Sequence, residues 1–84
     1  MRVTLKLYAT LTDYLPPAAR VENRVQLDVE DGATIASMLA PYNIPPRLAH
    51  LVLVNGLYVP PEERAARTFR EGDVLAIWPP IAGG

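Results

Sequence analysis

Asp73-Val-Leu-Ala-Ile-Trp-Pro-Pro-Ile-Ala-Gly-Gly84 is the segment around which the rest of the chain is arranged. Residues Asp73 to Trp78 predict a β-strand, because they are mostly small and apolar, include β-branched and aromatic side chains, and begin at a Gly72-Asp73 turn. Pro79-Pro80 ends this strand, since proline fixes φ and cannot donate a ladder hydrogen bond. Ile81, Ala82, Gly83 and Gly84 remain as a short tail without a charged side chain.

We therefore divide the chain into a folded domain over residues 1–78 and an extended C-terminal tail over residues 79–84. Six extended residues reach roughly 20 Å, at about 3.3 Å per residue. The terminal carboxylate of Gly84 is thus expected to enter the active site of another protein while the domain stays outside. The alternative is an ordinary frayed end that carries two glycines by chance.

The composition restricts the classes of protein to be considered. With 84 residues, of which 50% are hydrophobic, the chain predicts one globular domain with a modest core. A net charge of −1, with both signs interspersed, argues against a nucleic-acid or anionic-membrane partner. The absence of cysteine excludes a disulfide, a thiolate metal site and a thiol nucleophile. The N-terminus lacks the apolar run of a signal peptide, and no apolar stretch approaches the ~20 residues of a membrane span, so we expect a cytoplasmic protein.

The first half of the chain predicts two strands and a helix. Residues 2–8 and 24–29 alternate polar and apolar side chains, which is typical of half-buried strands, and we expect them to form an antiparallel pair. A short helical turn over residues 9–15, ended by Pro16-Pro17, connects them. Thr34 is the predicted N-cap of a short helix that Pro41 limits. Its apolar face, and the side chain expected beneath its end, are Ile35, Met38, Leu39 and Ile44.

The second half predicts a hairpin and a charged segment before the last strand. Residues 51–54 are an apolar strand, Asn55-Gly56 is a strong hairpin signal, and residues 57–59 form a short return strand. Residues 62–70 are expected to hold one helical turn anchored by Phe69. The fold class is therefore α+β. The arrangement is a β-grasp, with a mixed sheet of four to five strands, one main helix on one face, and the N- and C-terminal strands adjacent at the centre.

Tyr8 and Trp78 are expected on the solvent side of the central strands, together with Ala76 and the only lysine, Lys6. Exposed aromatic side chains beside a functional tail indicate a docking surface, so we assign partner binding to Tyr8, Trp78 and the tail residues Pro79, Pro80, Ile81 and Ala82. The alternative is that Trp78 folds over the rim of the core.

Other polar residues give no catalytic or metal site. His50 is the only histidine and is interpreted as an ordinary residue at the start of a strand, and Ser37 as a solvent-facing helix position. Arg64, Arg67 and Arg70 share a helical spacing suited to phosphate or an acidic partner. Because glutamates lie among them, we prefer a solvated, self-paired segment. Glu30-Asp31 is interpreted as turn and cap chemistry. No bound metal or cofactor is predicted.

The chain resembles the ubiquitin-like sulfur carriers of the MoaD/ThiS type. Four stretches carry the resemblance: the opening strand followed by Leu11 and Leu15, Asp31-Gly32-Ala33-Thr34, Val52-Leu53-Val54-Asn55-Gly56, and Glu71-Gly72-Asp73 leading to Gly83-Gly84. The final Trp78-Pro79-Pro80-Ile81-Ala82-Gly83-Gly84 resembles the small subunit of molybdopterin synthase more than the thiamine branch of the family.

This resemblance implies a co-substrate rather than an enzyme. An E1-like activating enzyme, which supplies ATP and Mg²⁺, would adenylate the carboxylate of Gly84, and a sulfur donor would convert it to a thiocarboxylate. An α-carboxyl group has a pKa of about 3.3–3.7 and is ionised at neutral pH, so it is a competent nucleophile. Glycine leaves the carbonyl uncrowded, and Gly83 lets the tip enter a narrow channel. The expected acceptor partner is the large subunit of molybdopterin synthase.

Three functions remain open from the sequence. The first is a sulfur carrier, for molybdenum or tungsten cofactor synthesis or, as its nearest variant, for the thiazole of thiamine or another acceptor. The second is a ubiquitin-like modifier that is conjugated to lysine. The third is a β-grasp interaction module whose Gly-Gly end is incidental. We prefer the first.

Overall fold

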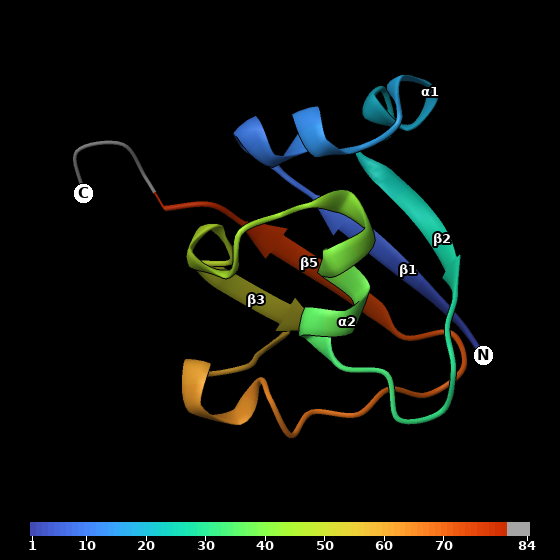
Figure 1. The fold of residues 1–84 in the computed structure, drawn as a ribbon, viewed down its shortest axis with the longest axis vertical. Helices are drawn as coiled ribbons and strands as arrows, with labels where there is room; N and C mark the ends of the chain where they lie inside the picture. The colour runs from blue at the N-terminus through green and yellow to red at the C-terminus, as the bar shows by residue number, and fades with distance from the viewer. Residues whose placement is uncertain (81–84) are drawn as a thin grey trace.

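The computed structural model describes residues 1–80, which form a five-stranded mixed sheet with helices on one face (Figure 1). The strand order is β2-β1-β5-β3-β4. The strands are β1 (Arg2–Leu7), β2 (Arg24–Asp28), β3 (Leu51–Val54), β4 (Leu57–Tyr58) and β5 (Val74–Trp78). β1 and β5 run parallel and every other neighbouring pair is antiparallel. The predicted β-grasp arrangement is therefore confirmed.

Strand β5 lies at the centre of the sheet, as predicted for the C-terminal strand. Leu5 pairs with Leu75 and Leu7 with Ile77 on the β1 side, and Val52 pairs with Ile77 on the β3 side. The side chains of these residues are fully buried. Because β5 has a hydrogen-bonded neighbour on each side, its position is fixed along its whole length.

The connection from β1 to β2 differs in part from the sequence prediction. The 3-10 helix η1 (Ala9–Tyr14) is the expected turn, but a second helix, α1 (Pro17–Arg20), follows it. Pro17 begins this helix instead of preventing it, because the first position of a helix needs no N–H donor. Arg20 stabilises the connection by donating to the backbone oxygens of Leu15 and Asp13, both at 3.0 Å. On β2, Val25 and Leu27 are half-buried rather than buried, since β2 is an edge strand.

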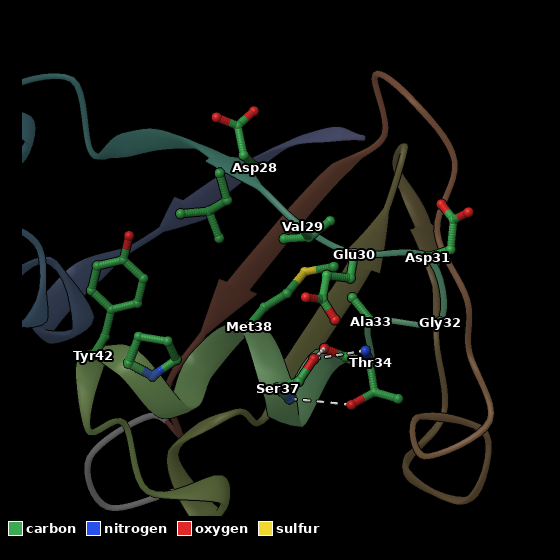
Figure 2. A pocket seen from close by; sticks show the side chains of 12 residues that line it. Asp28, Val29, Glu30, Asp31, Gly32, Ala33, Thr34, Ser37, Met38 and Tyr42 are labelled. Carbon is green, nitrogen blue, oxygen red and sulfur yellow. Dashed lines mark hydrogen bonds between the residues drawn. The ribbon is translucent and has the colours of Figure 1, made fainter.

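Helix α2 (Ile35–Leu39) packs across the sheet and begins at the predicted N-cap. The Thr34 hydroxyl accepts from the Ser37 N–H at 3.1 Å, and the Ser37 hydroxyl accepts from the Thr34 N–H at 2.8 Å, which makes a reciprocal capping box (Figure 2). The helix changes to a 3-10 turn, η2 (Ala40–Tyr42), where Pro41 was expected to end it. Ile44 is buried as predicted.

The β3–β4 hairpin has the predicted turn. Asn55 and Gly56 both have positive φ, 52° and 82°, as a two-residue hairpin turn of type I′ requires. Strand β4 is one residue shorter than predicted, although Val59 still donates to the Val52 oxygen at 2.9 Å and is buried. Two further 3-10 turns are η3 (Pro46–Leu48) and η4 (Pro61–Glu63), and Phe69 anchors the segment after η4 in the core.

One hydrophobic core lies between the sheet and the helices. Its buried members are Val3, Leu5, Leu7, Leu11, Leu15, Ile35, Met38, Leu39, Ile44, Ala49, Val52, Val54, Val59, Phe69, Leu75 and Ile77. In the described part of the chain, none of the helices has the length and apolar character needed to cross a membrane.

Candidate functional site

The root of the C-terminal tail is held on both sides. The Trp78 oxygen accepts from the His50 N–H at 3.1 Å, and the Ile77 oxygen accepts from the Tyr8 N–H at 3.1 Å. Trp78 is the last residue of β5 and is paired with Leu51. The tail therefore leaves the domain from a fixed point at the end of the central strand. Its predicted site residues Ile81, Ala82, Gly83 and Gly84 lie outside the described residues.

Tyr8 and Trp78, the two predicted docking residues, are in direct contact. Their rings are stacked with centroids 4.1 Å apart and an interplanar angle of 2°. Both side chains are half-buried, and neither packs against the core between the sheet and α2. Trp78 thus lies on the face of the sheet opposite the buried Ile77 and Val52, which is the side predicted for the docking surface.

The same side of the sheet carries further apolar side chains, and we call this surface the open face. Lys6 pairs with Ala76, Leu53 with Ala76 and Tyr58, and Leu51 with Trp78. Except for Tyr58, whose neighbour in β4 is the exposed Leu57, these residues alternate with core residues along their strands. The open face consists of Lys6, Tyr8, Leu51, Leu53, Tyr58, Ala76 and Trp78. Ala76 lies on the predicted face of the sheet, but it is not exposed to solvent as predicted. Its small side chain lies between longer ones and is only 8% exposed.

A groove of about 660 Å³ lies beside the tail root, and we call it the root groove. It is lined by Ala9, Thr10, His50, Leu51, Trp78, Pro79 and Pro80. The sequence analysis singled out the last three of these as partner-binding but missed the first four. Leu51 was within reach of sequence reasoning, since pairing β3 with β5 places it opposite Trp78. Ala9 and Thr10 carried no such signal.

Ala9 has an unusual backbone conformation that shapes this groove. Its φ is 53°, in the left-handed region, which costs a non-glycine residue roughly 1–2 kcal/mol. The conformation turns the chain out of β1 immediately after Tyr8 and into η1, whose Leu11 is buried in the core. The Thr12 hydroxyl donates to the Ala9 oxygen at 3.0 Å and supports the turn.

Arg64 fixes the opposite wall of the root groove. Its guanidinium donates to the Ala49 oxygen at 2.6 Å, the Val59 oxygen at 3.0 Å and the His50 oxygen at 3.0 Å. The predicted self-pairing of the arginine segment is wrong, because the ion pairs within residues 1–80 are Arg2–Asp28 and Arg24–Glu22. Arg64 is therefore a structural clamp that joins three backbone oxygens.

A second hollow, of about 440 Å³, lies between the end of β2, the following loop and α2 (Figure 2). Asp28, Glu30 and Asp31 stand on its rim, and their carboxylates do not converge on one point in Figure 2. No group of acidic or histidine side chains within residues 1–80 is arranged to hold a metal ion. The interpretation of Glu30-Asp31 as turn residues agrees with this geometry, and the capping box explains Thr34 and Ser37.

The ThiS family model matches residues 9–84, which is nearly the whole chain. The chain belongs to the ThiS family. Members of this family are small ubiquitin-fold proteins that act as sulfur carriers or modifiers, are generally not catalysts, and work with E1-like activating enzymes. The recognition made from the sequence is confirmed at this level, while the molybdopterin branch stays a prediction.

The fold is also similar to a solved structure, that of SAMP1 from Haloferax volcanii. The two structures align with a TM-score of 0.68 and 24% sequence identity, and the match covers 100% of each chain. At this identity, the likeness shows the β-grasp fold alone. A search of curated proteins found no match to this ThiS-family chain.

Proposed function

We propose that this ThiS-family protein is a sulfur carrier whose working group is the carboxylate of Gly84. The observation that supports this most directly is the fixed root of the tail. There the N–H groups of Tyr8 and His50 donate to the backbone oxygens of the last two residues of β5, Ile77 and Trp78. Pro79-Pro80 continues from that root with restricted φ, and the remaining side chains are uncharged. A carrier needs this combination, because its terminus must enter an enzyme while its domain docks outside.

The proposed chemistry has two steps, adenylation of the carboxylate and replacement of AMP by sulfur. A carboxylate oxygen of Gly84 attacks the α-phosphorus of ATP, the bond to the pyrophosphate oxygen breaks, and an acyl-adenylate forms. A hydrosulfide equivalent from the sulfur donor then attacks the carbonyl carbon, and the carbon–oxygen bond breaks as AMP leaves. The product is a thiocarboxylate on Gly84. ATP and Mg²⁺ belong to the activating enzyme in this scheme, and the present chain contributes the tail and the docking surface.

The proposed sulfur acceptor is the precursor of molybdopterin, bound to the large subunit of molybdopterin synthase. The aromatic-Pro-Pro-x-x-Gly-Gly ending supports this branch, and the stacked Tyr8–Trp78 pair gives the open face an aromatic anchor of the kind enriched in protein interfaces. Sulfur transfer to the thiazole of thiamine is the nearest alternative. Both use the same activated carboxylate.

The test is the intact mass of the untagged protein, co-expressed with its activating enzyme and sulfur donor. A species heavier by the difference between sulfur and oxygen, absent when Gly84 is deleted, is the expected result. Conjugates linked to lysine without any thiocarboxylate would favour the modifier function instead. If neither product forms while the activating enzyme is active on a known carrier, the proposal is wrong and an interaction module is favoured.

A further inference from the structure

The lining of the root groove is mostly apolar and carries no acidic, lysine or arginine side chain. Its lining includes Ala9, Leu51, Trp78, Pro79 and Pro80, so most of it is apolar. Thr10 and His50 contribute the polar groups, and none of the lining residues is acidic, lysine or arginine. An ionised side chain in this groove would lose hydration without gaining an ion-pair partner. The groove therefore favours an aliphatic or aromatic occupant.

The length of the tail restricts what can cover this groove. Four residues follow Pro80, and they span at most about 14 Å when extended, at about 3.3–3.6 Å per residue. An active site that holds the carboxylate of Gly84 must therefore have its mouth within that distance of Pro80. Pro79 and Pro80 themselves line the root groove. The part of the activating enzyme that surrounds the entrance to its active site must therefore lie against this groove.

The walls of the root groove are fixed by hydrogen bonds before any partner binds. His50 donates its N–H to the Trp78 oxygen, and its own oxygen accepts from Arg64. Trp78 is in turn stacked on Tyr8. A preformed pocket lowers the entropic cost of binding, so it is suited to receive a single anchoring side chain.

We propose that the root groove receives an aliphatic or aromatic side chain at the mouth of the activating enzyme's tail channel, and that this contact sets how far Gly84 reaches into the active site. The proposal rests on the proposed function and adds to it a specific docking position and the chemistry of the group that occupies it. In this arrangement the open face adds contact area around the anchoring side chain. The root groove determines how far the tail extends into the active site.

The test uses the purified activating enzyme with ATP and sodium sulfide as the source of hydrosulfide, and measures AMP formation and pyrophosphate release as the carrier concentration is varied. Thr10→Arg introduces a charged side chain into the groove from an exposed helix position, and Leu51→Glu places a carboxylate on the opposite wall. Each is expected to raise the KM for the carrier about tenfold or more, the effect of losing an interface hot spot. The matched controls are Thr68→Arg and Leu57→Glu, exposed positions outside the groove and the open face. These should stay within about twofold of the unmodified protein.

A second measurement detects the contact itself. A photo-crosslinking benzophenone amino acid replaces Thr10 in one protein and Thr68 in another, and only the first should crosslink to the activating enzyme. Thermal unfolding shows whether Leu51→Glu remains folded, and if it does not, Thr10→Arg and the crosslink decide. The groove proposal would be overturned by an unchanged KM in Thr10→Arg together with no crosslink at position 10. In that case adenylation of the unmodified protein would still support the proposed function. Absence of adenylation of the unmodified protein would instead overturn the proposed function.

Discussion

Asn55 and Asp73 join the β3–β4 turn to the start of β5 through side-chain hydrogen bonds. The Asn55 amide donates to Asp73 Oδ1 at 2.9 Å, and its Oδ1 accepts from the Val74 N–H at 2.9 Å. Asp73 Oδ2 also accepts from the Arg70 N–H at 2.9 Å. These contacts connect the Val-Asn-Gly and Gly-Asp motifs, which are far apart in the sequence, and fix where β5 begins. They therefore also fix the position from which the tail leaves.

This network predicts a dependence of stability on pH. The hydrogen bond from Asn55 holds the pKa of Asp73 below its usual range, with smaller contributions from the Arg70 N–H and the charges of Arg67 and Arg70. Because the folded pKa lies below the unfolded value of about 3.9, the stabilisation is fully present above that value. It is lost as the pH falls through the folded pKa.

We expect Asp73→Asn to lower the free energy of unfolding at neutral pH and to flatten its decline in acid. Urea unfolding at a series of pH values between neutrality and about pH 3 measures both effects. Asp13→Asn, at an exposed position of η1, is the matched control for the loss of one surface carboxylate. An unchanged acid slope in Asp73→Asn would show that Asp73 contributes nothing to it.

The Tyr8–Trp78 stack predicts a measurable coupling between the two side chains. Tyr8→Ala and Trp78→Ala should each destabilise the domain, and the double variant should lose less than the sum of the two. The expected coupling energy is about 0.5–1.5 kcal/mol, as for other aromatic pairs. A double-mutant cycle in urea measures this value, with Tyr8→Phe as the control that keeps the ring. Strict additivity would mean that the contact contributes little to stability.

Arg64 is predicted to be more important for stability than the other arginines. Arg64→Ala removes the donors of three hydrogen bonds to backbone oxygens and should reduce the free energy of unfolding by about 1–3 kcal/mol. Arg64→Lys keeps the charge but not the planar fork, so only partial recovery is expected. Chemical denaturation provides the measurement, and Arg47→Ala, at an exposed position, should change stability by less than about 0.5 kcal/mol. Equal effects at positions 47 and 64 would contradict the assignment of a clamp.

Local patterns in the sequence were sufficient for much of this fold. The alternation in β1, the Asn55-Gly56 turn and the Thr34 cap each depend on neighbouring residues, and all three are confirmed. The adjacency of the terminal strands and the side on which Trp78 lies followed from combining these patterns.

Features that depend on distant contacts were not predictable in the same way. The clamp made by Arg64 needs carbonyl oxygens 14 and 15 residues earlier in the chain. Ala9 adopts a left-handed backbone conformation for which alanine has no preference. This conformation is therefore determined by the packed structure and not by the local sequence. The root groove combines three such separated segments, which is why sequence reasoning found the tail side of it and missed the rest.

The last prediction concerns the stiffness of the tail root. Replacing both Pro79 and Pro80 with glycine leaves the number of residues before Gly84 unchanged but greatly widens the directions that the tail can take. The activating enzyme must then order two more flexible residues, at a cost of about 1 kcal/mol for each fixed backbone. The catalytic efficiency of adenylation should therefore fall by about tenfold or more, while thermal stability changes little. Pro16 and Pro17, an exposed pair at the N-cap and first position of α1, provide a matched double-glycine control outside the root groove. If the tail variant is adenylated as efficiently as the unmodified protein, the enzyme must order the tail through contacts with residues 81–84 alone, and stiffness at the root has no role.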